Sequence, residues 1–305
     1  MTQKTPPDVI FLLGAGASVK AGVPDTYQLV TGFQSHLRSD SGLNDVVAAV
    51  ERILKILGEW QASQKETDDR IDVELLLDAL ESLRTRRENY LLKFFENPKY
   101  IIEGYPEKGL IIERLRNFIK SEAIVDRTKI SYLDQLRTFL DYSPLDVFSV
   151  NYDTVIEQFC VVHKLQLTDG FESRWEPQSF DTNTSGLRLY KLHGSITWYK
   201  TDLGDYVKVP ILAQKDEIEL VTGERAKSLI LYPANKWEFD EPLLELLMLF
   251  KKRLATAKVC IVVGYSFRDE HITRIFWDAA RQNRELNLIL ISPSATEIYR
   301  TKLKF

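Results

Sequence analysis

A glycine-rich turn directly after a strongly apolar run has the clearest chemical meaning in this chain. Val9–Leu13 is unbroken apolar sequence, which is typical of a strand buried on both faces of a parallel sheet. Gly14, Ala15 and Gly16 follow at once, ahead of a segment that can begin a helix. Because such a turn presents backbone N–H groups and a partial positive charge, it favours an anionic diphosphate. The alternative is a tight strand-to-helix turn that binds nothing, since Gly-x-Gly alone is a weak signal.

Two features of the same region argue against a hydride-transferring dehydrogenase. The dehydrogenase fingerprint needs a third glycine, and Val19 stands at that position. It also needs an acidic residue at the end of a second strand about 20 residues further on, whereas residues 29–37 have a helical pattern. The sequence therefore leaves open a nucleotide site of another kind.

Two segments in the middle of the chain place polar side chains where predicted strands end. Asn151 and Asp153 follow the strand-like run 145–150, and His193 follows another apolar stretch. Ligands of open α/β sheets bind beyond the carboxyl ends of the strands, so these three residues are candidates for function. The alternative is that Asp153 or Thr154 only caps the next helix and that His193 is structural.

The segment VVGYSFRDEH repeats this arrangement near the end of the sequence. A buried strand ends at Gly264, and the small polar residue Ser266 follows. Asp269 is the predicted N-cap of the next helix. This segment therefore joins the other candidates at the predicted ligand-binding edge.

The elements that must position these residues alternate between strands and helices. The strand-like runs are 9–13, 145–150, 229–232, 259–264 and 286–291. Helical patterns between them include 154–163, 241–257 and 270–283. This alternation predicts an α/β fold, a Rossmann-like parallel sheet with helices on both faces.

The pattern is different from about residue 43 to residue 140. Helical spacing dominates there, as in Val73, Leu76, Leu77, Leu80 and Leu83. We predict an inserted helical subdomain at 43–140, between the segments 1–42 and 141–305 that form the Rossmann-like core. A mixed strand and loop region at about 187–221 is a second excursion. The leucine stripe 76–83 is either an oligomer surface or plain packing onto the sheet.

Composition limits the classes of function. Among 305 residues, 40 basic against 44 acidic side chains give a net charge of −4, which offers no field for non-specific nucleic-acid binding. Cys160 and Cys260 form no CxxC pair, so a cysteine zinc ribbon is excluded and we expect two buried thiols and no metal. No apolar run approaches the about 18 residues of a membrane span, and no signal-peptide core is evident. We therefore expect a cytoplasmic protein.

Together these residues resemble SIR2-like proteins of the sirtuin superfamily, in the bacterial branch linked to antiphage defence. The family's opening motif, GAGxS followed by G-[IV]-P-D, stands at 14–18 and 22–25, and its N-x-D element stands at 151–153. Its L-H-G stands at 192–194 and its late G-x-S at 264–266. The four motifs occur in the family's order and cover the chain from about residue 8 to residue 294.

The resemblance implies an enzyme that cleaves NAD at the ribose carbon that bears nicotinamide. It implies that His193 is the general base, that Asn151 orients the reacting groups and that Asp153 orients them or binds the nicotinamide end. The implied NAD-contacting residues are Gly14, Ala15, Gly16, Ser18, Asp25, Gly264 and Ser266. With water as the acceptor, NAD is a substrate, and the products are nicotinamide and ADP-ribose.

Two departures from deacylating sirtuins argue against lysine deacylation, which stays the less favoured enzymatic alternative. Thr26 and Tyr27 stand where those enzymes usually have Phe-Arg, and the four-cysteine zinc module is absent. A catalytically quiet module that binds NAD or ADP-ribose is the alternative from another class, although a pure binder does not need both Asn151 and His193. The resemblance also implies a homo-oligomer and control by assembly or by a separate partner such as a HerA-type ATPase.

Overall fold

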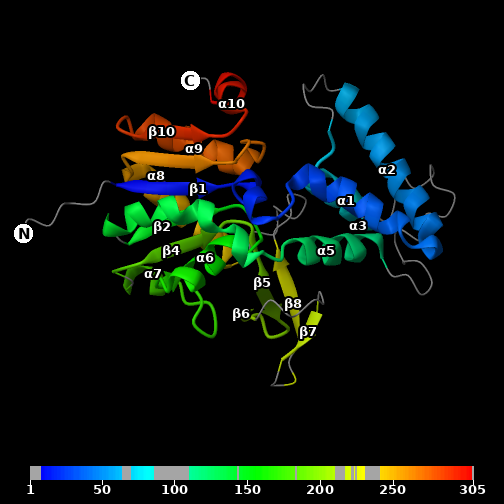
Figure 1. Ribbon diagram of the computed structural model, residues 1–305, viewed down its shortest axis with the longest axis horizontal. Coiled ribbons are helices and arrows are strands. Elements are labelled where there is room, and N and C mark those ends of the chain that lie inside the picture. The colour runs from blue at the N-terminus through cyan, green and yellow to red at the C-terminus, as the bar shows by residue number, and fades with distance from the viewer. Residues whose placement is uncertain are drawn as a thin grey trace, which may run out of the picture.

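A six-stranded parallel sheet forms the centre of the molecule. The structure, a computed structural model, describes residues 8–63, 70–85, 110–142, 144–182, 184–209, 217–220, 223, 225–230 and 241–303. The strand order is β10-β9-β1-β2-β4-β3 (Figure 1). These strands are β1 (Val9–Leu13), β2 (Leu145–Ser149), β3 (Leu167–Thr168), β4 (Leu187–Lys191), β9 (Val259–Val263) and β10 (Asn287–Ile291). The predicted Rossmann-like parallel sheet is confirmed.

Helices cover both faces of this sheet, as expected for parallel strands. On one face, Leu12 and its neighbours pack against α8 (Leu243–Thr256) and α9 (Glu270–Gln282), with α10 (Ala295–Lys302) nearby. On the other face, Phe11 and Leu13 pack against α6 (Val155–His163) and the 3-10 helix η6 (Ser131–Tyr142). Adjacent residues of β1 thus serve opposite cores, because side chains alternate along a strand.

A separate group of helices lies beyond the carboxyl ends of the parallel strands (Figure 1). It contains α1 (Thr26–Arg38), α2 (Asn44–Ser63), α3 (Val73–Thr85) and α5 (Ile111–Glu122), which share one apolar cluster. The short helix η3 (Ser41–Leu43) joins α1 to α2. The boundaries 43 and 140 of the subdomain stay a prediction, and α1 packs with the helices of the predicted insert.

The leucine stripe of α3 lies inside this helical cluster. Leu76, Leu77 and Leu80 are at most 2% exposed, and their neighbours are residues of α1, α2 and α5. The suggestion that the stripe is an oligomer surface is therefore wrong. The alternative, packing onto the sheet, is also wrong, because the stripe packs against the other helices. An apolar helix face indicates that the face is buried, but it does not indicate which element covers it.

A four-stranded antiparallel sheet makes the second layer of strands, with the order β6-β5-β8-β7. Its strands are β5 (Gly194–Thr201), β6 (Tyr206–Lys208), β7 (Glu217–Glu219) and β8 (Arg225–Ile230). Two sequence expectations are corrected here. The run predicted at 229–232 does not join the parallel sheet, because residues 229 and 230 end β8, and residues 231 and 232 lie outside the described residues. Residues 187–191 are a central strand and not an excursion, since a short apolar run does not reveal its partner strands.

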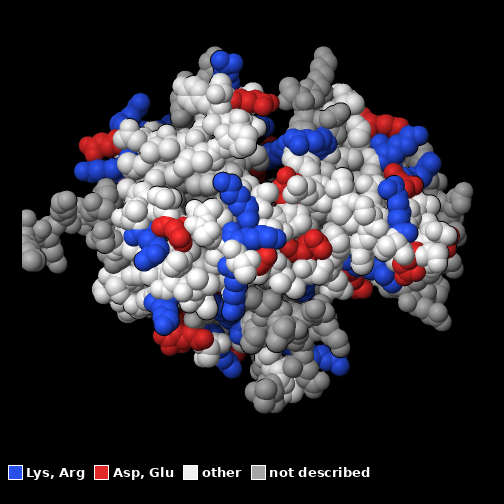
Figure 2. Space-filling view, viewed as in Figure 1, with Lys and Arg blue, Asp and Glu red and all other residues white. Residues whose placement is uncertain are grey.

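Three further features concern the cysteines, the apolar character of the helices and the surface charge. Both cysteines are buried free thiols, as predicted, and burial raises the pKa of Cys160 to about 12. In the described part of the chain, no helix combines the length and apolar character that crossing a membrane requires. Basic and acidic side chains are interspersed over the face in Figure 2, in keeping with the small net charge.

Candidate active site

The chain leaves β1 through two short 3-10 turns, η1 (Ala15–Ala17) and η2 (Val19–Ala21). The long helix α1 begins only at Thr26, where the Asp25 carboxylate accepts hydrogen bonds from the N–H groups of residues 27 and 28. The expectation of a helix starting directly behind the glycines is therefore wrong. Asp25, predicted to contact NAD, serves here as a helix cap.

The glycines of this turn are required by its packing against the turn after β9. The N–H groups of Gly14 and Gly16 donate to the carbonyls of Val263 and Gly264, both at 3.0 Å. A Cβ on Gly14 would lie 2.7 Å from the carbonyl oxygen of Gly264, and Gly264 itself has a φ of +62°. Two of the amides predicted to hold a diphosphate are thus used within the chain. Gly16 and Ser266 are exposed, and Ala15 is half-buried, so these parts of the two turns face solvent.

Replacing Gly264 with alanine is expected to destabilise the protein by about 2–5 kcal/mol. The new Cβ would lie 2.3 Å from the amide nitrogen of Ala17, on a backbone that L-residues adopt with strain. Urea unfolding measures the loss. Gly204 is the matched control, because its φ is +91° but a Cβ there meets nothing within 4 Å. Equal losses in the two variants would show that backbone strain, and not the contact between the turns, is responsible.

Asn151 ties the end of β2 to the turn after β1. Its side-chain Nδ2 donates to the carbonyl of Gly14 at 2.9 Å and to Oγ of Ser18 at 3.0 Å. Its backbone N–H donates to Oγ of Ser149 at 3.1 Å. Both amide hydrogens are therefore used inside the protein, so Oδ1 is the atom of this side chain that is suited to a ligand.

His193 lies at the same edge of the sheet as Asn151. Strands β2 and β4 pair in parallel with Ser149 opposite Lys191, so both residues lie the same distance beyond their strands. Nε2 of His193 lies 2.9 Å from Oδ2 of Asp269, and both side chains are buried. Since a carboxylate only accepts, Nε2 carries the proton and Nδ1 of the neutral ring carries the lone pair. Nδ1 is buried and has no hydrogen-bond partner among the described residues.

The contact between His193 and Asp269 spans the site. Strands β4 and β9 are separated by β2 and β1, which is about 14 Å at the usual strand spacing. The loops after the outer two of these four strands thus meet over the inner two. Asp269 is held in turn by the N–H groups of His271 and Ile272 at the start of α9, which confirms its predicted role as N-cap.

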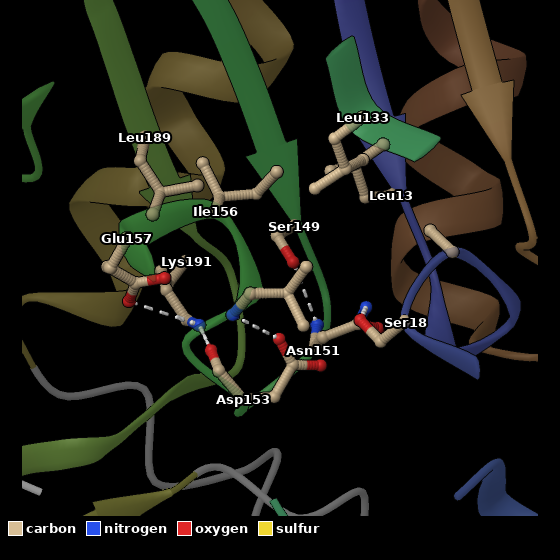
Figure 3. A pocket seen from close by; sticks show the side chains of 12 residues that line it. Leu13, Ser18, Leu133, Ser149, Asn151, Asp153, Ile156, Glu157, Leu189 and Lys191 are labelled. Atoms are coloured by element: carbon tan, nitrogen blue, oxygen red, sulfur yellow. Dashed lines mark hydrogen bonds and ion pairs between the residues drawn. The ribbon is translucent and has the colours of Figure 1, made fainter. Parts of the chain in front are cut away.

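Asn151 lines a small pocket together with the charged side chains of Asp153, Glu157 and Lys191 (Figure 3). Lys191, only 1% exposed, donates to the backbone carbonyl of Asp153, and its Nζ lies 3.5 Å from Oε1 of Glu157. Burial raises the pKa of Glu157, and the positive charge of Lys191 opposes the rise. In Figure 3, Asp153 lies between Lys191 and Asn151, and the labelled apolar side chains lie above them in the view. The lining residues are Leu13, Ala17, Ser18, Leu133, Ser149, Asn151, Asp153, Val155, Ile156, Glu157, Leu189 and Lys191.

Asp153 has a structural task as well as a place in this pocket. Its Oδ1 accepts from the N–H of Val155 at 2.9 Å and so caps α6. Burial and the negative charge of Asp153 raise the pKa of Tyr132, whose hydroxyl donates to the carbonyl of Ala17. The carboxylate of Asp153 therefore caps α6 and also lines the pocket at the carboxyl ends of the strands, so both alternatives that the sequence left open apply.

Sequence reasoning missed the roles of Asp269, Lys191 and Glu157. Asp269 was assigned only as a helix cap, although its place at the carboxyl edge of β9 was a usable signal. Lys191 ends a buried strand, and a lysine is almost never buried unless it has a partner. Glu157 carries no such signal, because one acidic residue in the first turn of a helix is ordinary. Among the described residues, no group of three or more His, Cys, Asp or Glu is arranged to hold a metal ion.

The fold and this edge define the class of protein, an α/β protein whose polar site gathers at the carboxyl ends of four parallel strands. The chain belongs to the SIR2-like domain family, whose sequence profile matches residues 146–304, just over half of its length. Comparison with curated protein sequences gave no match.

Solved structures of Sir2 proteins show a distant likeness. A SIR2 homologue in complex with NAD is 14% identical with a TM-score of 0.43, over 93% of this chain and 77% of that one. A mutant Sir2 homologue in complex with ADP-ribose is 12% identical with a TM-score of 0.42, over 94% and 82%. A structure described as the basis for the mechanism and regulation of Sir2 enzymes is 13% identical with a TM-score of 0.42, over 97% and 85%. The bound NAD and ADP-ribose are observations on those two proteins, and the likeness to this chain concerns the fold.

Proposed function

We propose that this SIR2-like protein is an NAD hydrolase that releases nicotinamide and ADP-ribose. The observation that carries the proposal is the buried pair of His193 and Asp269 at the same sheet edge as Asn151, with no partner for Nδ1 of the histidine among the described residues. An oriented imidazole with a lone pair is what a general base requires. Two solvent-facing turns at the same edge, with Gly16 and Ser266, would leave room for the diphosphate and adenine end.

The proposed reaction is attack of water on the ribose carbon that bears nicotinamide. The carbon–nitrogen bond to nicotinamide breaks, and its electron pair neutralises the positively charged ring, so the leaving group needs no proton. Nδ1 of His193 takes a proton from the attacking water, while Asp269 stabilises the imidazolium that forms. The proton then passes to solvent, and the products are nicotinamide and ADP-ribose.

The other predicted residues have supporting tasks in this proposal. Asn151 uses its two N–H bonds to fix the turn after β1 and offers Oδ1 to the substrate. Asp153, held through its carbonyl by Lys191, orients the nicotinamide end. Ala15, Gly16, Ser18, Gly264 and Ser266 are proposed to contact the rest of NAD, while Gly14 and Asp25 act by shaping the turn and capping α1.

The direct test is to incubate the purified chain with NAD and measure nicotinamide and ADP-ribose by chromatography. Stoichiometric release of both supports the hydrolase. Addition of an acetylated peptide tests the deacylase alternative, which requires O-acetyl-ADP-ribose as a product. A hydrolase forms none, and its rate does not depend on the peptide.

A binding module is the second candidate, and one observation favours it. His193 is only 3% exposed, and the amide hydrogens of Asn151 are already used within the chain. A site whose side chains are buried and hydrogen-bonded to each other suits a domain that binds NAD or ADP-ribose without turnover. Calorimetry that shows NAD binding, with no product even in the presence of candidate partners, would favour this alternative.

Control of the activity belongs to the same proposal. An unrestrained NAD hydrolase in the cytoplasm would deplete its own cell, so we propose that assembly or a separate partner, such as a HerA-type ATPase, sets the activity in antiphage defence. Mass photometry of the chain alone and with candidate partners, read beside nicotinamide release, tests this control. Equal turnover by the isolated chain and by every assembly would contradict it.

Replacing Asp269 with serine is expected to lower kcat about 10–100-fold, because the charged hydrogen bond that orients His193 is lost. Serine keeps the N-cap of α9, so the fold is retained. Asp269→Asn preserves the shape and the cap, but its Nδ2 would donate to Nε2 of His193 and move the ring proton to Nδ1, so kcat should fall at least as far as in the serine variant. Steady-state nicotinamide release measures the effect, and an unchanged kcat in the serine variant would show that Asp269 only caps α9.

A further inference from the structure

The start of α3 connects the helical group to the loops of the candidate site. Asp72 caps this helix, because its Oδ1 accepts a hydrogen bond from the N–H of Leu75 at 2.8 Å. Its Oδ2 lies 3.4 Å from Nη1 of Arg268. Arg268 directly precedes Asp269, the partner of His193. The first turn of α3 is therefore docked on the loop that holds Asp269.

An aromatic ring from the loop after β1 joins the same contact. The guanidinium carbon of Arg268 lies 4.7 Å from the centroid of the Tyr27 ring, and that of Arg70 lies 4.0 Å from it. A guanidinium is attracted to the face of an aromatic ring. These contacts fix the start of α3 relative to the loops after β1 and β9.

Glu74, in the first turn of α3, contacts a third loop, the N-x-D element. Its Oε1 accepts a hydrogen bond from the hydroxyl of Tyr152 at 3.1 Å. Tyr152 is 9% exposed, and it belongs to the apolar cluster of the helical group. Its neighbours in sequence, Asn151 and Asp153, line the pocket of the candidate site. The side chain of Tyr152 thus anchors the N-x-D element in the helical group.

The backbone carbonyl of Tyr152 is bonded to the segment that follows His193. It accepts a hydrogen bond from the N–H of Ile196 at 3.0 Å, and Oγ of Ser195 lies 3.5 Å from it. Both of these residues belong to β5, which begins directly after His193. Tyr152 therefore links Glu74, the N-x-D element and the strand behind His193 through hydrogen bonds of its own side chain and backbone.

We propose that Glu74 is a positioning residue that sets the placement of Asn151 relative to His193 through the hydroxyl of Tyr152. The inference rests on the proposed function for the reaction that this placement serves. A misplacement of about 1 Å can slow a reaction about 100-fold, so a fixed N-x-D element matters for turnover. Glu74 lies outside the four motifs, and the helical group thereby gains a part in catalysis in addition to its packing.

Steady-state nicotinamide release by Glu74→Met tests the assignment, because methionine removes the acceptor at similar size. The value of kcat should fall about tenfold, since the N-x-D element loses a hydrogen bond to a charged group that anchors it. KM for NAD should stay at the parent value, because the solvent-facing turns after β1 and β9 are untouched. Glu74→Gln keeps an oxygen that accepts from the phenol, so it should restore kcat to near the parent value.

Tyr152→Phe completes a double-mutant cycle with Glu74→Met. It should lower kcat to a similar degree, and the double variant should be no slower than either single variant. Effects that multiply in the double variant would show that the two side chains act independently, which contradicts the assignment.

Glu81→Met is the matched control for a structural effect. Glu81 lies on the same helix and pairs with Arg116 of α5 at 3.6 Å, within the helical group. The substitution should lower the midpoint of thermal unfolding, as Glu74→Met does, while kcat stays at the parent value. An equal fall of kcat in the two variants would attribute the effect to a loosened helical group and overturn the role of Glu74.

The ring signals of His193 report its placement without any turnover. The chain has four histidines, so nitrogen NMR of the imidazoles is simple, and His193→Ala identifies the relevant signals. Glu74→Met should shift the signals of His193 and leave those of His163, which pairs with Asp134 outside the site. Glu81→Met should shift neither.

This second measurement distinguishes the inference from the hydrolase proposal. A parent protein that releases no nicotinamide, while the His193 signals respond to Glu74→Met alone, supports the positioning role and contradicts the hydrolase. Turnover of NAD with a kcat that is indifferent to Glu74→Met contradicts the positioning role alone. A parent without turnover, whose His193 signals are also indifferent to Glu74→Met, would overturn both.

Discussion

Replacing His193 with alanine is expected to reduce nicotinamide release from NAD by about 10²–10⁴-fold, the usual contribution of a general base. An imidazole can take up a proton from water during turnover, and Nδ1 of His193 has no partner within the described chain. The substrate should still bind, since the solvent-facing turns after β1 and β9 are untouched. The measurement is steady-state release of nicotinamide, with NAD binding followed by calorimetry.

The chain offers a matched control for this substitution. His163, at the end of α6, also pairs with an aspartate, and its Nε2 lies 2.9 Å from Oδ1 of Asp134. His163→Ala removes a histidine–aspartate contact of the same length outside the site, so turnover should be unchanged. Full turnover by the His193 variant would refute its assignment as the base.

Replacing Asn151 with alanine is expected to lower kcat about 10²–10³-fold, because Oδ1 is lost and the glycine turn is released. The substitution leaves the carbonyl of Gly14 and the hydroxyl of Ser18 without their partner. Such a loss costs about 1–3 kcal/mol of stability, which urea unfolding measures. Nicotinamide release from the folded fraction measures the catalytic effect.

Asn283 provides the control for the stability component. Its Nδ2 also donates to two backbone carbonyls, those of Leu254 at 3.0 Å and Ala257 at 2.7 Å. Asn283→Ala should therefore destabilise the protein to a similar degree while kcat stays at the parent value. A matching fall of kcat in both variants would attribute the effect of Asn151 to stability alone.

The central sheet was predictable because apolar runs of strand length are a strong local signal. Val9–Leu13, the run beginning at Leu145 and the run beginning at Val259 are buried strands of the parallel sheet. The prediction that the run around residue 229 belongs to the parallel sheet was wrong, because the direction of strand pairing depends on distant partners. The prediction that residues 187–191 lie outside the central sheet was wrong for the same reason, because their alternating LRLYK pattern is compatible with either sheet.

The candidate site was predictable in its members but not in their contacts. Position at strand ends is a local property, so Asn151, Asp153 and His193 were found from sequence. The partner of His193 comes from a loop 76 residues away, and no local pattern announces such a pair. The glycines were assigned to a diphosphate, whereas Gly14 and Gly264 are also needed because two turns touch.

If the protein hydrolyses NAD as proposed, the contact between His193 and Asp269 makes turnover depend on a completely folded core. The two ends of this contact belong to non-adjacent strands, with α8 and the antiparallel layer between them in the chain. In a refolding experiment, nicotinamide production should return after the far-ultraviolet circular dichroism, because helices form before such distant loops meet. Turnover is thus a stricter gauge of an intact core than secondary-structure content.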